Sequence, residues 1–287
     1  MPGLVEISKE ILNNKQAAYI IGYEIDKHNR VKPFVAHNAD EAERLTFNHH
    51  ALNNLAVYLK RLPKPKEGKI GIVAKGCDIR AIVGLIQENQ VNRDDLYIIG
   101  VNCSGVATDY DVEFNPENTQ IKCKYCQLKT PAVYDVLIGE SEEFPLPEDK
   151  MGDMMAKIEA MTPEEKFTFW SEQFEKCVKC YACRQVCPLC YCEQCIAEKS
   201  VPQWVETSSS VKGNFAWNII RAFHLAGRCV GCNECERACP ADIPLSLLNK
   251  KMGMTAKQEF DYSHGMAIDQ PTLVGNYNLK DNQDFIK

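Results

Sequence analysis

Cysteine is the residue type whose number and spacing in this chain could do chemistry. The 287 residues include 15 cysteines, and the N-terminal sequence lacks the basic and then apolar segments of a signal peptide. We therefore expect a cytoplasmic protein, whose thiols stay reduced and form few disulfides. Reduced cysteines at short spacing are typical of metal sites. Packing thiols are the alternative, but cysteine is not used for packing at this density, so the sequence predicts metal binding.

Two runs of four cysteines share one spacing. In each run, three cysteines follow at two-residue intervals, and a fourth comes after three more residues and directly precedes a proline. The runs are Cys177, Cys180, Cys183 and Cys187 before Pro188, and Cys229, Cys232, Cys235 and Cys239 before Pro240. This spacing is typical of proteins with two 4Fe–4S clusters. Structural zinc sites instead pair two closely spaced ligands with two more farther along the chain, so the spacing favours iron–sulfur clusters.

The same spacing predicts which cysteines share a cluster. Three cysteines at two-residue intervals can wrap a tight loop around three corners of a cube, and the proline turns the chain out of the site. The fourth cysteine of each run ligates the other cluster. The predicted ligand sets are Cys177, Cys180, Cys183 and Cys239 for the first cluster, and Cys229, Cys232, Cys235 and Cys187 for the second.

Three further cysteines directly follow the first run, and neither cluster needs them. They are Cys190, Cys192 and Cys195. Their closeness to a cluster predicts a role in metal binding, either in an additional cluster with a ligand from elsewhere or in a zinc or redox-active site. Spare packing thiols are the alternative.

The N-terminal half has the pattern of an α/β domain. Continuous apolar runs are typical of buried parallel strands, and two strands joined by a short turn predict a hairpin. Asp78 is well placed to cap the helix that follows it. Strands are predicted over 18–25, 31–36, 70–74 and 96–101, and helices over 40–45, 51–62 and 79–87.

The remaining four cysteines are predicted to meet in this half. Cys77 and Cys103 follow the strands at 70–74 and 96–101, so both lie at the carboxyl ends of parallel strands, where open α/β sheets bind ligands. Cys77 also lies at a helix N-terminus, which favours a thiolate. Cys123 and Cys126 add a closely spaced pair. Four cysteines are what a third 4Fe–4S cluster needs, although zinc could use the same four.

The predicted fold therefore has an α/β domain with one cluster at the carboxyl ends of its parallel strands, followed by a mainly α-helical domain with two clusters. The α/β domain covers 1–140, and a linker rich in Glu and Pro covers 141–165. The helical domain covers 166–252, and a polar tail, a candidate partner-binding arm, covers 253–287.

Several motifs resemble those of a known group of redox subunits. They are Lys75-Gly-Cys77-Asp-Ile-Arg-Ala, Ile99-Gly-Val-Asn-Cys103, Cys123-Lys-Tyr-Cys126 and Ala132-Val-Tyr-Asp135-Val-Leu-Ile-Gly139. Over residues 18–140, their order is similar to that in the beta subunits of deazaflavin-reducing hydrogenase and formate dehydrogenase. This resemblance implies a 4Fe–4S cluster beside an FAD. The family's Gly-rich segment that helps to hold the flavin is not visible before Ala18, so the cluster carries over and the FAD is not favoured.

Lys75 and Gly76 are the candidate residues for contact with a flavin or nucleotide, and stabilisation of the loop is the alternative for both. The apolar helix predicted over 214–227, between the two cysteine runs, resembles the α-helical ferredoxin domain of succinate dehydrogenase iron–sulfur subunits and of the heterodisulfide reductase small subunit. Trp217 and His224 on this helix are predicted to be core or cluster-shielding residues.

The predicted function is electron transfer through three or more 4Fe–4S clusters in a cytoplasmic multi-subunit oxidoreductase. The resemblance implies a catalytic subunit and further iron–sulfur or flavin subunits as partners. A net charge of −6 argues against nucleic-acid binding, and no apolar run reaches the roughly 20 residues that cross a bilayer. The alternatives are an FAD-containing subunit that exchanges hydride with a deazaflavin or NAD(P), and a zinc-stabilised scaffold or redox sensor.

Overall fold

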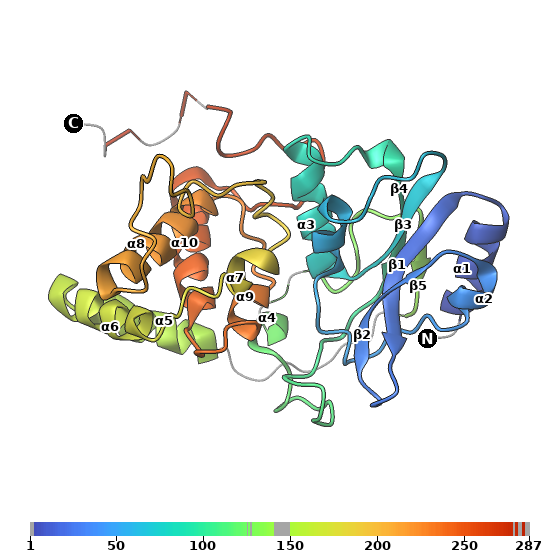
Figure 1. Ribbon diagram of the computed structural model, residues 1–287, viewed down its shortest axis with the longest axis horizontal. Helices are drawn as coiled ribbons and strands as arrows, with labels where there is room; N and C mark the ends of the chain where they lie inside the picture. The colour runs from blue at the N-terminus through green and yellow to red at the C-terminus, as the bar shows by residue number, and fades with distance from the viewer. Residues whose placement is uncertain are drawn as a thin grey trace. The chain divides into compact units, whose positions relative to one another are not determined.

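The computed structural model describes residues 3–124, 126, 128–140, 150–277, 279–280 and 283–284. The chain divides into two compact units (Figure 1). The N-terminal unit comprises Met1–Asp149 together with Gly265–Gln270, and the C-terminal unit comprises Lys150–His264 together with Pro271–Lys287. No helix in the described residues is both long enough and apolar enough to cross a membrane.

The N-terminal unit is built on a mixed sheet of five strands in the order β2-β1-β3-β4-β5. The strands are β1 (Ala17–Ile25), β2 (Val31–Ala36), β3 (Lys69–Ala74), β4 (Leu96–Val101) and β5 (Val136–Ile138). β1 and β2 pair antiparallel, as the predicted hairpin requires, and all other pairs are parallel. β3 and β4 are neighbours. Their carboxyl ends therefore meet at one edge of the sheet, where Cys77 and Cys103 follow.

Helices lie on both sides of this sheet, with α1 and α2 on one side and α3 on the other (Figure 1). The helical segments are α1 (Leu4–Asn13), α2 (Ala39–Ala42), the 3-10 helix η1 (Leu55–Lys60), α3 (Gly76–Gln87), the 3-10 helix η2 (Arg93–Asp95) and α4 (Ile121–Lys124). The helix predicted over 51–62 is only η1, because Asn54 caps it and Pro63 follows closely. α3 starts earlier than predicted, so Asp78 is its third residue and accepts a hydrogen bond from Lys75 N at 3.1 Å.

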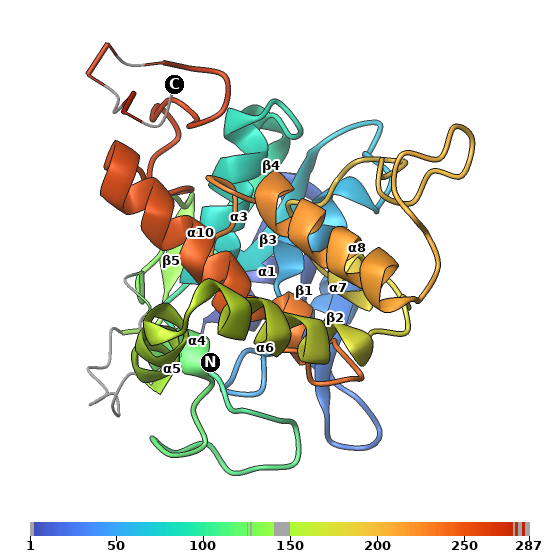
Figure 2. The ribbon, with the colours of Figure 1, turned by 90° about the vertical axis from the view of Figure 1, so that its left-hand side faces the viewer.

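The regular elements of the C-terminal unit are helices throughout its described residues. They are α5 (Lys150–Ala160), α6 (Pro163–Glu175), α7 (Ala182–Gln185), α8 (Val211–His224), α9 (Glu234–Arg237) and α10 (Leu245–Phe260). Thr162 and Glu165 form a capping box that starts α6. Figure 2 looks onto this unit and shows α6 beside α8, and α10 contacts α5, α8 and α9. Phe174, Trp217, Ile243 and Leu245 form its core together with Cys183 and Cys235.

Two stretches differ from the predicted segments. Residues 150–160, predicted as part of the linker, form α5, and α10 continues beyond Met252 to Phe260. Residues 141–149 of the predicted linker lie outside the described residues. Residues Gly265–Gln270 of the predicted tail pack on the N-terminal unit, where Gln87 Nε2 donates hydrogen bonds to Ala267 O and Gln270 O, both at 2.8 Å. Part of the predicted arm is therefore used within the chain.

Candidate metal centres

The loops of the two four-cysteine runs have the same backbone shape. In each, the residue before the second cysteine and the residue after it have positive φ angles: Lys179 (52°) and Tyr181 (58°) in the first run, Gly231 (69°) and Asn233 (54°) in the second. A left-handed conformation costs of order 1 kcal/mol or more at a residue other than glycine. Three residues other than glycine adopt this conformation in the two loops. Both loops therefore turn tightly before they enter α7 and α9, as a loop around a cube would.

The first predicted ligand set lines a single pocket. Cys177, Cys180 and Cys183 of the first run line a pocket together with Cys239 of the second run. Trp217, only 2% exposed, and Tyr181 form part of its wall and make an edge-to-face contact with ring centroids 4.9 Å apart. A largely apolar wall around four thiols fits a cluster that is kept from water. The structure thus brings a cysteine from each run to one pocket.

The second predicted ligand set gathers around Cys235. The pKa of this thiol is raised to about 12, mainly by burial and against the opposing charge of Arg221, and the nearby thiols of Cys229 and Cys187 contribute to the rise. Cys187 therefore lies near the second run, although it belongs to the first. Cys232 is buried as well, and Asn249 Nδ2 of α10 lies 3.5 Å from Cys235 Sγ as a hydrogen-bond donor.

A buried asparagine positions the first cysteine of the first run. Asn214 is fully buried on α8, and its Nδ2 donates hydrogen bonds to Phe174 O at 2.9 Å and to Cys177 O at 2.7 Å. The side chain thus joins α8 to the end of α6 where the cysteine loop begins. This role was not predicted, although a polar residue within an apolar helix face is a signal for it. His224, predicted to be buried, is exposed at the end of α8.

The four cysteines of the N-terminal unit influence one another electrostatically. The pKa of Cys103 is raised to about 12, mainly by burial, and the thiols of Cys123 and Cys126 contribute to the rise. Burial also raises the pKa of Cys77 well above its ordinary value, and Cys103 contributes to this shift. Cys77 lies in the first turn of α3 as predicted, but burial outweighs the helix terminus, so its thiol is neutral. Iron binding here must therefore displace protons.

Backbone and side-chain hydrogen bonds hold these cysteines in place. Asn54 Nδ2 donates to Cys77 O at 3.0 Å, Cys103 N donates to Lys129 O at 2.9 Å, and Val106 N lies 3.4 Å from Cys123 Sγ. A hydrogen bond to sulfur stabilises a thiolate, so the Val106 amide suits a cysteine that ligates a metal.

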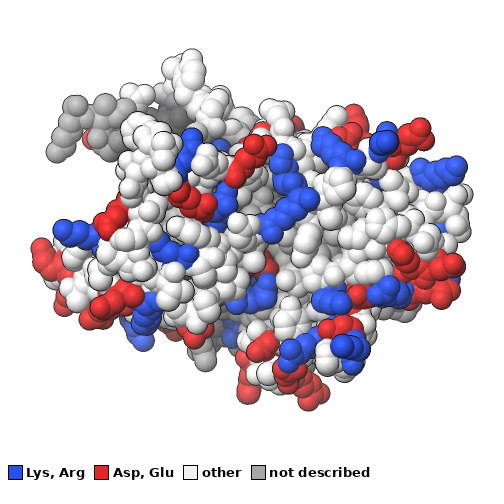
Figure 3. Space-filling view, viewed as in Figure 1, with Lys and Arg blue, Asp and Glu red and all other residues white. Residues whose placement is uncertain are grey.

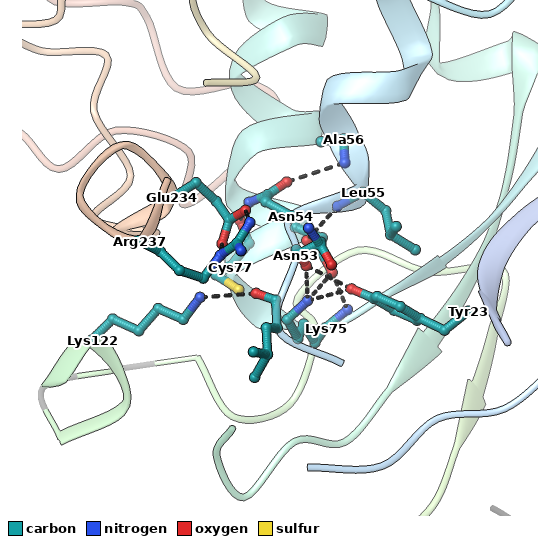
Figure 4. Close-up of polar contacts among 12 residues, drawn as sticks. Tyr23, Asn53, Asn54, Leu55, Ala56, Lys75, Cys77, Lys122, Glu234 and Arg237 are labelled. Atoms are coloured by element: carbon teal, nitrogen blue, oxygen red, sulfur yellow. Dashed lines mark hydrogen bonds and ion pairs between the residues drawn. The ribbon is translucent and has the colours of Figure 1, made fainter. Parts of the chain in front are cut away.

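Lys75 and Gly76 have structural roles. Lys75 is 1% exposed, and Figure 4 shows its ammonium directed at Tyr23 and Asn53. Nζ donates to Tyr23 Oη at 2.7 Å, to Asn53 O at 2.6 Å and to Asp78 Oδ2 at 3.0 Å. Burial alone lowers the pKa of Lys75, but Asp78 and then Tyr23 outweigh it, so the ammonium stays charged.

At Gly76, an added Cβ would lie 1.6 Å from Leu128 O, so only glycine lets that loop approach α3. The contacts of Lys75 and this close approach at Gly76 favour the alternative of loop stabilisation for both residues.

Comparison with known proteins agrees with the motifs. Residues 176–244 match the family model of a 4Fe-4S dicluster domain. This segment is a 4Fe–4S dicluster domain. The chain is also 24% identical to the F420-dependent formate dehydrogenase subunit beta of Methanocaldococcus jannaschii, over 86% of each chain. It is 24% identical to the F420-dependent formate dehydrogenase 1 subunit beta of Methanococcus maripaludis, over 73% of this chain and 76% of that one. The resemblance to formate dehydrogenase beta subunits predicted from the motifs is confirmed.

The three extra cysteines of the dicluster domain lie in different surroundings. Cys190 makes a hydrogen bond with Cys187, Cys195 packs against the apolar core of the unit, and Cys192 is exposed. In the described part of the chain, no three Cys, His, Asp or Glu side chains close around a point that would hold a single metal ion, these three included.

A larger pocket opens beside Cys103 in the N-terminal unit. Its volume is about 320 Å³, and it lies where β4 and β5 end. On one wall, His49 stacks on Phe114 with ring centroids 3.7 Å apart, and its Nδ1 lies 3.0 Å from Gly105 O. The lining residues are Phe47, Asn48, His49, Asn102, Cys103, Ser104, Gly105, Gly139 and Glu140. The motifs did not predict this pocket, because its residues come from three separate loops.

Proposed function

We propose that this chain relays electrons through three 4Fe–4S clusters in a cytoplasmic complex of the formate dehydrogenase type. The broader function, an iron–sulfur electron-transfer subunit of an oxidoreductase complex, is supported by the dicluster domain and by the relatives. The observation that carries the finer proposal is the pocket that Cys239 shares with three cysteines of the other run. Four thiols that come from two runs and line one pocket are what a dicluster protein requires.

Each proposed cluster has its own ligand set. They are Cys177, Cys180, Cys183 and Cys239; Cys229, Cys232, Cys235 and Cys187; and Cys77, Cys103, Cys123 and Cys126. A bound 4Fe–4S cluster supplies reversible one-electron transfer. The chain's own residues bury the thiols, exclude water through Trp217 and Tyr181, and aim hydrogen bonds at sulfur from Asn249 and from the Val106 amide. Burial and such hydrogen bonds are the means by which a protein sets cluster potentials.

The composition of the full chain, purified without oxygen, tests this proposal. We expect about twelve irons and as many acid-labile sulfides per chain, because each cluster contributes four of each, and we expect no stoichiometric flavin. Iron, sulfide, zinc and released flavin are measured on the same sample. About eight irons would contradict the third cluster. Zinc with little sulfide would contradict all three and favour a zinc scaffold or redox sensor.

A flavin-containing subunit is the second candidate function. The pocket of about 320 Å³ beside Cys103 favours it, because a cofactor there would lie next to the proposed third cluster. Such a subunit would exchange hydride with a deazaflavin or NAD(P). Stoichiometric FAD in the composition measurement would support this function and replace the simple relay.

The end of the chain is the proposed contact with a catalytic oxidoreductase subunit or with other iron–sulfur or flavin subunits. Tyr277 and Leu279 are 79% and 88% exposed. Basic and acidic side chains are interspersed on the face shown in Figure 3, which does not suit nucleic acid. Exposed apolar side chains such as these are suited to contact with a protein partner.

Removal of residues 275–287 is expected to weaken complex formation at least tenfold while all clusters are retained. This truncation keeps α10, residues 265–270 and Leu273, which lies against Gly227. Burial of one large apolar side chain contributes about 1.5–3 kcal/mol, and 1.4 kcal/mol is tenfold in affinity. The measurement is co-purification with the complex and iron content per chain, with Tyr277→Ser as a milder variant. Loss of iron with unchanged complex formation would contradict the assignment.

A further inference from the structure

One buried arginine lies among thiols of both proposed ligand sets of the dicluster domain. Arg221 is on α8 and only 6% exposed. Its Nη2 donates a hydrogen bond to Cys183 O of the first set at 3.0 Å. Its strongest charge interactions are with the thiols of Cys235 and Cys187 of the second set, followed by Cys190 and Cys183. A single side chain is therefore close to both sets.

No carboxylate pairs with this guanidinium among the residues that the structure describes. Glu234, a buried acid on α9, pairs with Arg237, whose Nη2 lies 2.7 Å from Oε2. Arg221 Nε is also buried without a hydrogen-bond partner. An uncompensated buried cation is costly, so a chain that keeps one must offer it negative charge. The thiols around Arg221 provide that charge when they are ionised by metal binding.

The sign of the effect on a cluster follows from electrostatics. Four thiolate ligands make a 4Fe–4S cluster anionic, and reduction adds one more electron. A fixed positive charge in a medium of low dielectric constant stabilises the reduced form more than the oxidised form. The guanidinium is permanently protonated, so its charge does not vary over the physiological pH range.

We propose that the buried guanidinium of Arg221 raises the reduction potentials of both clusters of the dicluster domain through its positive charge. The inference rests on the proposed function and on its ligand sets. Arg221 forms and breaks no bond during the reaction. The electron that a cluster accepts comes from the redox partner in the complex, which is oxidised by one electron.

Redox titration of the full chain, followed by electron paramagnetic resonance, tests the inference. Arg221→Met removes the charge at similar volume. Both midpoint potentials are expected to become more negative, with at least a tenfold change in the oxidised-to-reduced ratio at a fixed potential, or about 59 mV for one electron. Arg221→Lys, which keeps the charge, is expected to shift both potentials much less.

Two matched variants separate this effect from others. Asn249→Leu removes the hydrogen bond to Cys235 Sγ and is expected to shift only the cluster of the second set. Lys257→Met removes an exposed cation, which pairs with Asp261 on the surface of the same unit, and is expected to shift neither. The comparison therefore tests buried charge against local hydrogen bonding and against surface charge.

Iron content accompanies each titration. If Arg221→Met loses iron, Arg221→Gln replaces it, because its amide can still donate to the Cys183 carbonyl. Unchanged potentials in a fully loaded neutral variant would overturn the inference, and so would a shift confined to one cluster. A wild-type chain without clusters would instead overturn the proposed function, so the two failures are distinguishable.

Discussion

Replacement of Cys239 by Ser is expected to remove the cluster of the first run, although Cys239 belongs to the second. The reason is the pocket that this thiol shares with Cys177, Cys180 and Cys183. By the same argument, Cys187→Ser is expected to damage the cluster held by the second run more than the cluster of its own run, because Cys187 lies near Cys235. Each single variant should lose about four irons per chain.

Double variants make this test sharp. Cys180→Ser and Cys239→Ser affect the same proposed cluster, so their combination should lose no more iron than either alone. Cys232→Ser combined with Cys239→Ser should lose about eight irons, because it removes one ligand from each cluster. Iron and sulfide analysis with paramagnetic resonance measures this, and Cys192→Ser, an exposed thiol outside both sets, is the control. The reverse pattern would show that each run holds its own cluster.

Cys190 requires its own control in this experiment. Its thiol makes a hydrogen bond with Cys187, so it is close enough to replace a lost ligand. Cys187→Ser should therefore be made in the wild-type chain and in a Cys190→Ser background. If Cys187→Ser keeps the second cluster in the wild-type chain but loses it in the Cys190→Ser background, Cys190 is the replacing thiol.

Spacing along the sequence was sufficient to predict the tight loops of the cysteine runs and the positions of the strands. The two-residue intervals of the runs require a tight loop, and the structure has left-handed residues at Lys179, Tyr181 and Asn233 within them. The apolar runs of β3 and β4 are long enough to distinguish buried strands, and both form where predicted. These features depend on neighbours in sequence, which is why the sequence alone was sufficient.

Features that depend on distant contacts could not be predicted. Asn214 and Arg221 interrupt an apolar helix pattern, but only the packing of α8 shows that they meet the carbonyl groups of Cys177 and Cys183. The docking of residues 265–270 depends on two hydrogen bonds from Gln87, more than 170 residues earlier in the chain. Lys75 stands in one of the motifs on which the family resemblance rests, and this suggested a cofactor contact, whereas the partners of its ammonium lie inside the protein.

Replacement of Lys75 by Met is expected to destabilise the N-terminal unit by about 3–5 kcal/mol, the usual cost of removing one partner from a buried ion pair. The change leaves Asp78 without its cation and removes the donor to Tyr23 Oη and Asn53 O. Burial already raises the pKa of Asp78 against the opposing effect of Lys75. Without Lys75 that pKa rises further, and protonation of the carboxyl limits the loss.

Two variants in the same unit calibrate the effect. Lys9→Met breaks an exposed pair with Glu43 and should cost at most about 1 kcal/mol. The double variant Lys75→Met with Asp78→Asn removes both charges and should recover part of the stability. If Lys75→Met lowers the stability of the unit no more than Lys9→Met does, the structural role of the buried pair is contradicted.

The measurement must report on the N-terminal unit separately. All three tryptophans, Trp170, Trp204 and Trp217, belong to the C-terminal unit, so their fluorescence does not follow the sheet. Hydrogen exchange resolved by segment can follow it: amides of β1 and β3 should exchange faster in Lys75→Met, whereas those of α8 should be unchanged. The same experiment distinguishes the two roles considered for Lys75. A flavin contact would lower flavin content and leave exchange in the flavin-free chain unaltered, whereas a buried structural pair accelerates exchange with or without a flavin.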